Sequence, residues 1–322
     1  MKVGIIGTGR HGARYANHIL QDLPEMHLAA ISRRGEEGRA QAEAWGAAYH
    51  ADWRELVASP AVDAVIAVTT PNLHPEIAAC CAGQGKPLLI EKPLAIDAAA
   101  AARIVTLFGK ANLPLTVGQT LRYNPVIKAL RQELGRAGTL HLFSACHRLE
   151  QTSHPWLDLP EVAGGGVILH SAVHLFDALR FITGQEVKRV RAMVGHRYTS
   201  HLEDLFVAQI EMESGLIGSV NASKVGPARS GRYEFVGSRG QLQGDQVHGF
   251  VEFLRGGESE TLLESGPVPA ILPLLLDWQA LLAGHGENPV PGEDGLAAVR
   301  ICDACLLSAR EDRWVRVDEE KH

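Results

Sequence analysis

A glycine-rich segment near the start of the chain constrains the fold more than any other feature of the sequence. Residues 7–12 read Gly-Thr-Gly-Arg-His-Gly and match the pattern G-x-G-x-x-G, between a strand-like apolar run and a helix-like pattern. In that context the glycines allow a tight turn, close approach of the backbone to a pyrophosphate, and close packing of helix on strand. The unpaired N–H groups at the helix start would face the phosphates. The segment therefore predicts a dinucleotide-binding turn formed by Gly7, Gly9, Arg10, His11 and Gly12.

Up to about residue 120, short β-branched runs alternate with helical patterns, which is typical of repeated βα units on a parallel sheet. The expected strands are 3–7, 27–32, 62–69, 86–90 and 114–118. We therefore predict an α/β Rossmann domain over residues 1–120. Its ligands should bind beyond the carboxyl ends of the strands.

After residue 120 the pattern changes, and strand-like runs follow one another with short connections. A helix is expected at 125–135, a strand at 139–149, and a helix from the glycine triplet at 164–166 to about residue 182. Further strands are expected at 187–197, 204–213, 216–224, 231–237 and 248–255. Such an order favours an antiparallel sheet. We predict an α+β second domain over residues 121–322, and its final helix, about 294–309, is a candidate to pack back toward the first domain.

Composition excludes several classes of protein. Hydrophobic residues make up 46% of the chain and charged residues 21%, as in a globular protein. The net charge is −6 and neither predicted domain has a basic excess, so we expect no nucleic-acid partner. No apolar stretch approaches the roughly 18 residues of a membrane span, and no secretory signal is evident, so we expect no membrane association. Five cysteines, an odd number, suggest no disulfide framework and favour the cytoplasm.

The end of the second expected strand bears on the choice of cofactor. NAD-binding proteins usually place Asp or Glu there, to accept hydrogen bonds from the ribose hydroxyls. Here the strand ends in Ser32, Arg33 and Arg34, with no carboxylate. A hydroxyl followed by two guanidinium groups suits a 2′-phosphate. The sequence predicts a preference for NADP, with NAD also possible.

Six further motifs make the chain resemble the Gfo/Idh/MocA family of oxidoreductases. One is Glu91-Lys92-Pro93, at the end of another expected strand. The others are the loop 68–74, the crossover 118–125, the triplet 164–166 with the helix that carries His174, and the later turns 237–240 and 293–295. The resemblance spans nearly the whole chain.

The resemblance implies a Rossmann domain followed by a domain built on a large, mostly antiparallel, open-faced sheet. That sheet would join the chain into a homo-oligomer, either a dimer or a tetramer. Lys92 would lie beside the nicotinamide and polarise the reacting oxygen of a small-molecule substrate. Further cofactor contacts would come from Thr70, Pro71, Asn72, His74, Glu91, Lys92 and Gln119. Substrate contacts would come from Arg122, Asn124, His147, Trp156 and His170.

The expected active-site helix departs from the family pattern at one position. The family commonly places Asp four residues before the catalytic His, whereas this chain has His170 before His174. Residues at i and i+4 share a helical face, so we expect both imidazoles to point into one cleft. His174 is the candidate general base and His170 a second catalytic or substrate-binding group. Asp177 follows at i+7, which would also suit a metal, but the family supplies none and we expect no metal.

These features predict an NAD(P)-dependent dehydrogenase or reductase that transfers a hydride between nicotinamide and a sugar, cyclitol or related polyhydroxylated substrate. Two alternatives stay open from the sequence. One is a reductase of a non-sugar carbonyl or imine, because the usual Asp is missing. The other is a non-catalytic NAD(P)-binding sensor of the same fold.

Overall fold

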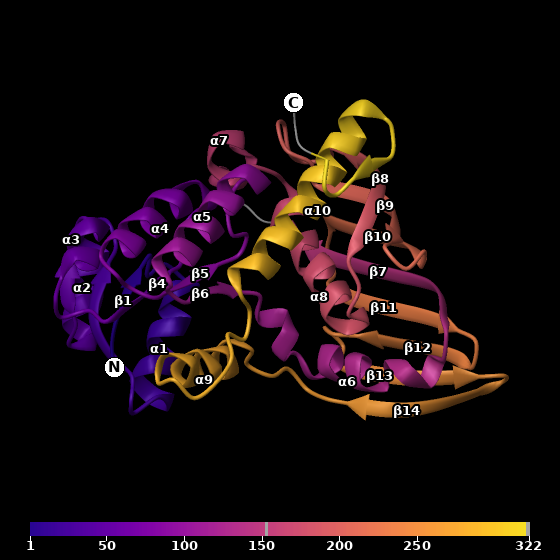
Figure 1. Cartoon of the computed structure of the whole chain (residues 1–322), viewed down its shortest axis with the longest axis horizontal. Coiled ribbons are helices and arrows are strands. Elements are labelled where there is room, and N and C mark those ends of the chain that lie inside the picture. Colours follow the sequence, from indigo (N-terminus) through magenta and orange to yellow (C-terminus); the bar gives the residue numbers. More distant parts are fainter. Residues whose placement is uncertain (152–153, 320–322) are drawn as a thin grey trace. The chain divides into compact units, whose positions relative to one another are not determined.

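The computed structural model of the chain describes residues 1–151 and 154–319, which form two compact units (Figure 1). The first unit contains Met1–Thr120 and Pro269–Leu296. The second contains Leu121–Val268 and the described residues from Ala297 onward. The stretch Pro269–Leu296 thus belongs with the first unit, although it follows the second unit's sheet in the chain.

The first unit is built on a six-stranded sheet in which every strand pair is parallel. Its strands are β1 (Lys2–Ile6), β2 (His27–Ser32), β3 (Ala48–His50), β4 (Ala64–Ala67), β5 (Leu88–Glu91) and β6 (Leu115–Gly118). Their order across the sheet is β3-β2-β1-β4-β5-β6. Strands β4, β5 and β6 are buried along their whole length, as expected for a parallel sheet covered on both faces. The predicted α/β Rossmann architecture is confirmed.

Helices cover both faces of this sheet. They are α1 (Gly12–Asp22), α2 (Glu36–Trp45), α3 (Trp53–Ala58), α4 (His74–Gly83), α5 (Ala98–Ala111) and α9 (Ile271–Leu282), with a 3₁₀ turn η1 at Pro71–Leu73. Figure 1 shows α3, α4 and α5 on one side and α1 with α9 on the other. The order of the strands reverses between β1 and β4. The carboxyl ends of these two strands are therefore where a doubly wound sheet binds its ligand.

The second unit is built on a nine-stranded sheet. Its strands are β7 (Leu140–Glu150), β8 (Val187–Gly195), β9 (Leu205–Met212), β10 (Ile217–Gly226), β11 (Ser230–Gly237), β12 (Gly240–Asp245), β13 (Phe250–Arg255), β14 (Glu258–Glu264) and β15 (Val315–Arg316). Their order is β14-β13-β12-β11-β7-β10-β9-β8-β15. Among the described strands of this second sheet, only β10 and β7 pair in parallel. The predicted large, mostly antiparallel sheet is confirmed.

One face of this sheet is covered by helices. The helices of this part of the chain are α6 (Pro125–Glu133), α7 (Pro160–Ala163), α8 (Val173–Thr183) and α10 (Gly292–Glu311), with 3₁₀ turns η2 (Thr120–Tyr123), η3 (Leu134–Ala137) and η4 (Pro155–Asp158). Helix α10 begins in the first unit and continues in the second. Figure 1 shows α6 and α8 against one face of the sheet. Along the strands, buried residues such as Phe143 and Phe206 alternate with exposed ones such as Leu142 and Val207, so the other face is open.

The segment after the glycine triplet is not a plain α-helix. Residues Ile168–Ala172 form a π-helical turn (η5), and α8 follows directly. The spacing of 3.6 residues per turn assumed for His170 and His174 therefore does not hold between them. A π-helical turn inserted in a helix is often found at a functional site.

One helical stretch is long and apolar enough to cross a membrane by length and composition, Pro160–Thr183. This corrects the expectation that no apolar stretch approaches that length. Of its apolar window, 78% is buried inside the structure, as in the core helix of a globular domain.

Several elements were not predicted from the sequence. Among them are the strands β3, β12 and β14 and the helix α9. Proline does not prevent α9 from forming, because Pro273 is its third residue, where a missing N–H costs no helical hydrogen bond. Strand β3 has three residues, and β14 exposes most of its side chains, so neither carries a strong periodic pattern.

Candidate cofactor and active site

Five segments of the first unit meet at the carboxyl edge of its sheet. They follow β1, β2, β4, β5 and β6, and parallel strands bring their carboxyl ends to one edge. The predicted cofactor residues at this edge are Gly7, Gly9, Arg10, His11, Gly12, Ser32, Arg33, Arg34, Thr70, Pro71, Asn72, His74, Glu91, Lys92 and Gln119. The structure therefore places all of them, including the candidate catalytic Lys92, at the same edge of the first sheet.

The glycine-rich turn leaves no room for side chains at two of its three glycines. Gly7 has φ +89°, and a Cβ there would lie 2.2 Å from the backbone oxygen of Val68. A Cβ on Gly12 would lie 1.9 Å from the backbone oxygen of Gly7. At Gly9 nothing lies within 4 Å of the Cβ position, so the backbone is open to a ligand. This is the cradle that a pyrophosphate requires.

Arg33 links the end of β2 to the glycine-rich turn. Its Nη1 donates a hydrogen bond to the backbone oxygen of Thr8 at 3.2 Å, and its Nη2 donates to the Glu37 carboxylate. Ser32 is buried and Arg34 is exposed. A guanidinium group therefore lies where an adenosine ribose would approach the turn.

A buried carboxylate, Glu91, joins the glycine-rich turn to the residue predicted to act in catalysis. Its Oε1 accepts hydrogen bonds from Tyr15 Oη at 2.5 Å and His11 Nε2 at 2.7 Å. Its Oε2 accepts one from the backbone N–H of Lys92 at 3.1 Å. Burial opposes ionisation, but the hydrogen bonds from His11 and Tyr15 and the charge of Lys92 outweigh it and lower the pKa of Glu91. The strand end that carries Lys92 is thus fixed by an ionised group.

His74 is hydrogen-bonded to the turn that follows Lys92. Its Nδ1 donates to the backbone oxygens of Pro93 and Leu94, at 3.1 and 3.2 Å. Burial lowers the pKa of His74 from 6.5 to about 4, although these hydrogen bonds act against the shift. The imidazole is therefore neutral at pH 7. The Lys92–Pro93 peptide bond is cis.

Three buried side-chain oxygen atoms at this edge have no hydrogen-bond partner among the described residues. They are Thr69 Oγ1, Asn72 Oδ1 and Gln119 Oε1. Buried polar atoms are nearly always paired, so unpaired ones indicate a missing ligand or water. Together with the open backbone at Gly9, they fit a nicotinamide dinucleotide laid across the carboxyl ends of the strands.

In the second unit, Arg122 forms a buried ion pair with Asp177. Arg122 Nε and Nη2 donate to the two carboxylate oxygens of Asp177, at 2.9 and 2.6 Å. Both side chains are almost fully buried. Asp177 therefore orients Arg122, and the structure gives no support to His170, His174 and Asp177 as a metal site. Among the described residues, no cluster of His, Cys, Asp and Glu is placed to hold a metal ion.

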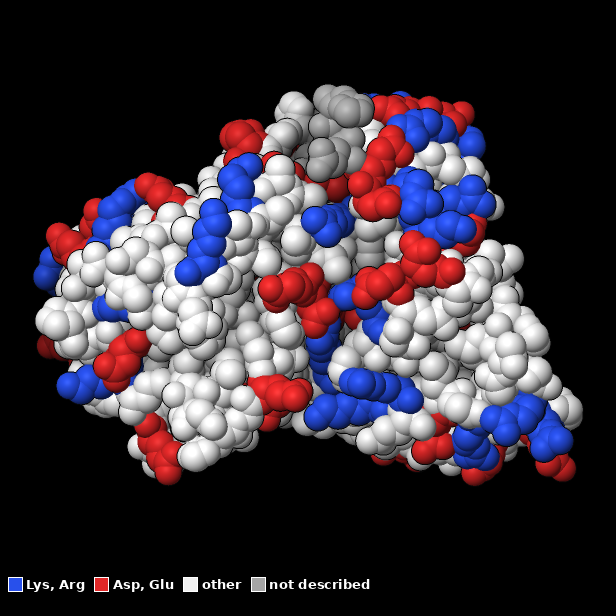
Figure 2. All heavy atoms as spheres, viewed as in Figure 1, with Lys and Arg blue, Asp and Glu red and all other residues white. Residues whose placement is uncertain are grey.

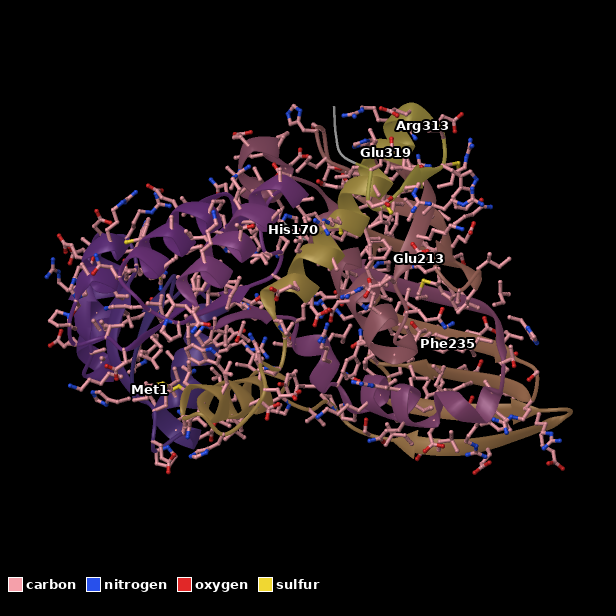
Figure 3. The ribbon with its side chains drawn as sticks, in the orientation of Figure 1. Met1, His170, Glu213, Phe235, Arg313 and Glu319 are labelled. Atoms are coloured by element: carbon pink, nitrogen blue, oxygen red, sulfur yellow. The ribbon has the colours of Figure 1, made fainter. Side chains whose placement is uncertain are left out.

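The two helical histidines lie in different kinds of helix. His170, labelled in Figure 3, lies in the π-helical turn, and its Nε2 donates to the backbone oxygen of Ala163 at 3.0 Å. Its ring meets the Trp156 ring edge-on, with centroids 5.4 Å apart. His174 lies in the first turn of α8 and is half-buried.

The start of this helical segment is held by a buried carboxylate on the β8–β9 loop. Glu203 Oε1 accepts hydrogen bonds from the backbone N–H groups of Gly166 and Ile168, at 2.9 and 3.0 Å. A Cβ on Gly166 would lie 1.9 Å from the backbone oxygen of Glu203, so only glycine fits there. Glu203 therefore positions the start of the helical segment that carries both histidines.

Polar side chains surround His147 on β7. The amide of Gln246 donates to His147 Nε2 at 3.2 Å, so Nδ1 carries the proton and donates to Ser171 Oγ at 3.4 Å. Asn124 donates to the backbone oxygen of Gln246 at 3.0 Å and caps α6 by accepting from the N–H of Val126. The predicted substrate residues Asn124 and His147 are thereby brought together.

The structure adds residues that the sequence did not single out. Tyr15, in the first turn of α1, lies four residues after the N-cap residue His11, and this spacing was the available signal. Gln246 and Ser171 gave no local signal, because 99 and 24 residues separate them from His147. Lys92 belongs to the first unit, and His170 and His174 belong to the second.

Comparisons with known proteins follow the same division. Residues 1–119 match a family model described as an oxidoreductase family with an NAD-binding Rossmann fold, and residues 128–243 match the GFO/IDH/MocA C-terminal domain. A myo-inositol 2-dehydrogenase of Thermotoga maritima is 30% identical, over 99% of each chain. A 1,5-anhydro-D-fructose reductase of Ensifer adhaerens is also 30% identical, over 91% of each. The solved structure of a levoglucosan dehydrogenase with NADH and levoglucosan aligns at a TM-score of 0.90, with 20% identity over 99% of this chain and 100% of the other.

The neutral, buried His74 predicts a pH dependence of stability. Its folded pKa, about 4, lies below the usual 6.5, so below pH 6.5 the unfolded chain takes up a proton that the folded chain does not. Between pH 7 and pH 5 this group should cost about 2 kcal/mol of unfolding free energy. Urea unfolding at both pH values, for wild type and His74→Gln, measures it. A variant that loses as much stability as wild type would contradict this role for His74.

Proposed function

The chain belongs to the Gfo/Idh/MocA family of NAD-binding oxidoreductases, and from this premise we propose that it is a dehydrogenase or reductase of a sugar, cyclitol or related polyhydroxylated compound, with a preference for NADP(H). The observation that carries the proposal is Lys92. It stands at the carboxyl edge of the first sheet, fixed by Glu91 beside the glycine-rich turn. The relatives named as an inositol dehydrogenase and an anhydrofructose reductase support the substrate class.

The cofactor would be held by groups of the first unit. The turn at residues 7–12, with Arg10 and His11, would hold the pyrophosphate, and Ser32, Arg33 and Arg34 the ribose end. The segment of Thr70, Pro71 and Asn72, together with Gln119, would hold the nicotinamide end. The unpaired oxygens of Asn72 and Gln119 support this assignment. When bound, the nicotinamide supplies the acceptor or donor of the hydride.

Lys92 and His174 would handle the oxygen and proton of the substrate. The ammonium group of Lys92 would stabilise the negative charge that develops on the oxygen when a hydroxyl loses its proton. His174 would take that proton in oxidation and return it in reduction. His170 would position the substrate, because its Nε2 is already committed to the backbone oxygen of Ala163.

Of the remaining predicted substrate residues, two would contact the substrate and two would position other residues. His147, buried between Ser171 and Gln246, would present a fixed tautomer. Trp156 would offer an aromatic edge beside His170. Arg122 and Asn124 would act through the residues they hold, because Asp177 occupies the guanidinium group of Arg122 and α6 uses the amide oxygen of Asn124.

The preference for NADP(H) is tested by binding alone. We expect NADPH to bind more tightly than NADH, because Arg33 offers a charged planar donor to the 2′-phosphate. Titration of the cofactor fluorescence at one ionic strength gives both dissociation constants. Arg33→Ala should weaken NADPH binding and leave NADH binding nearly unchanged. Tighter binding of NADH by wild type would refute the preference.

The assignment of Lys92 predicts a large kinetic effect. Lys92→Ala should lower kcat by about 10²- to 10³-fold, as for the loss of a group that stabilises an oxyanion, with little change in cofactor affinity. Turnover is measured on a panel of polyols and keto-sugars, with His174→Ala as the second variant, which should also lose most of its turnover. Near-normal turnover of Lys92→Ala would remove Lys92 from the mechanism.

The same measurements separate the alternative functions. Cofactor binding with turnover only on non-sugar carbonyls or imines would favour a reductase of that class. Cofactor binding with no turnover on any class would favour a sensor. The anchored Lys92 and the presence of His174 support an enzyme over a sensor.

We further propose that the open face of the nine-stranded sheet joins copies of the chain. Leu142, Val207 and Ile217 are exposed on the neighbouring strands β7, β9 and β10. Exposed apolar side chains grouped on one face favour association. A homodimer or homotetramer is expected, and a monomer mass in sedimentation at micromolar concentration would contradict it.

The wider setting follows the sequence expectations. All five cysteines are free thiols, which agrees with the reducing cytoplasm we propose as its location. Acidic and basic side chains are interspersed on the face drawn in Figure 2, which supports a small-molecule partner rather than a nucleic acid.

A further inference from the structure

An acidic side chain holds the guanidinium group on which NADP(H) recognition would depend. Glu37 lies in the first turn of α2, four residues after Arg33, and its carboxylate accepts a hydrogen bond from Arg33 Nη2. Arg33 Nη1 donates to the backbone oxygen of Thr8 in the glycine-rich turn. The guanidinium group is therefore shared between the turn and the start of α2.

We propose that Glu37 sets the cofactor selectivity of this chain by competing with the 2′-phosphate for Arg33. This inference rests on the proposed function and deepens it. A carboxylate and a phosphate bind the donor fork of arginine in the same way. To bind, NADP(H) must therefore displace the Glu37 carboxylate from Arg33 Nη2. Its 2′-phosphate is also repelled by the negative charge of that carboxylate. NAD(H) carries no 2′-phosphate and can leave the pair intact.

The charges close to Arg33 nearly balance, so the loss of one acidic side chain should change the affinity for the 2′-phosphate. Arg33 and Arg34 supply two positive charges, and Glu36 and Glu37 return two negative ones within the same short segment. Of the two acids, Glu37 is the one that contacts Arg33. The carboxylate of Glu36 lies near another arginine instead, with its Oε2 3.9 Å from Arg39 Nε. The Glu37 side chain is 77% exposed and that of Arg33 28% exposed, so a ligand can reach the pair and the pair is weak enough to open.

The test is Glu37→Gln, measured by fluorescence titration of NADPH and NADH without substrate at one low ionic strength. The glutamine keeps the size of the side chain and removes its charge. We expect NADPH to bind roughly 3- to 10-fold more tightly, the range for an exposed ion pair and one nearby like charge. The dissociation constant of NADH should change by less than about twofold.

Glu36→Gln is the matched control, because it removes the same charge from the same helical turn without touching Arg33. It should change either dissociation constant by less than about twofold. An equal gain in Glu36→Gln would overturn the proposal in favour of a general charge effect. Weaker NADH binding in Glu37→Gln would also overturn it, because Glu37 would then bind the ribose hydroxyls itself.

A double variant tests the route through Arg33. In the Arg33→Ala background the gain in NADPH affinity from Glu37→Gln should largely disappear, and an undiminished gain would refute this route. The wild-type ratio of the two affinities tests the proposed NADP(H) preference, and the change caused by Glu37→Gln tests the role of Glu37. Either can therefore fail without the other.

Discussion

The ionised carboxylate of Glu91 is the interaction on which the site of the first unit depends. It is buried at the end of β5, where an unpaired charge would be costly, and it is stabilised by Tyr15, His11 and the backbone N–H of Lys92. Two of these donors come from the glycine-rich turn and the helix after it. The segment that holds a phosphate and the residue predicted to polarise the substrate are therefore connected through one group. A shift of the turn would be felt at Lys92 within two hydrogen bonds.

The second unit uses the same device with a different carboxylate. Glu203 is buried and accepts hydrogen bonds from two backbone N–H groups at the start of the π-helical segment. Burial is the main cause that raises the pKa of Glu203, and these hydrogen bonds act against it. The glycine at position 166 allows the two backbones to meet. In each unit, a buried carboxylate joins the short segment that carries candidate catalytic residues to another segment of the chain.

Much of the fold could be predicted because it depends on local patterns. The glycine spacing at 7–12 predicted the first turn, and the alternating βα units predicted the parallel sheet. What could not be predicted depends on pairing over long distances or on weak periodicity. Gln246 reaches His147 across 99 residues, and no spacing in the sequence indicates that contact. The π-helical turn at His170 was missed because i and i+4 positions were assumed to follow α-helical geometry.

Burial alone does not decide the charge of a group at this site, as His74 and Glu91 show. Both side chains are fully enclosed at the same edge of one sheet, yet Glu91 is held ionised and His74 is held neutral at pH 7. The difference lies in the partners. Glu91 receives three donors and faces the charge of Lys92, whereas His74 donates one proton to two carbonyl oxygens that stabilise a cation too weakly to offset burial. The neighbours of Lys92 are thus an anion, Glu91, and a neutral imidazole behind Pro93, and neither adds a competing positive charge. That is the electrostatic environment an ammonium group needs if it is to stabilise an oxyanion.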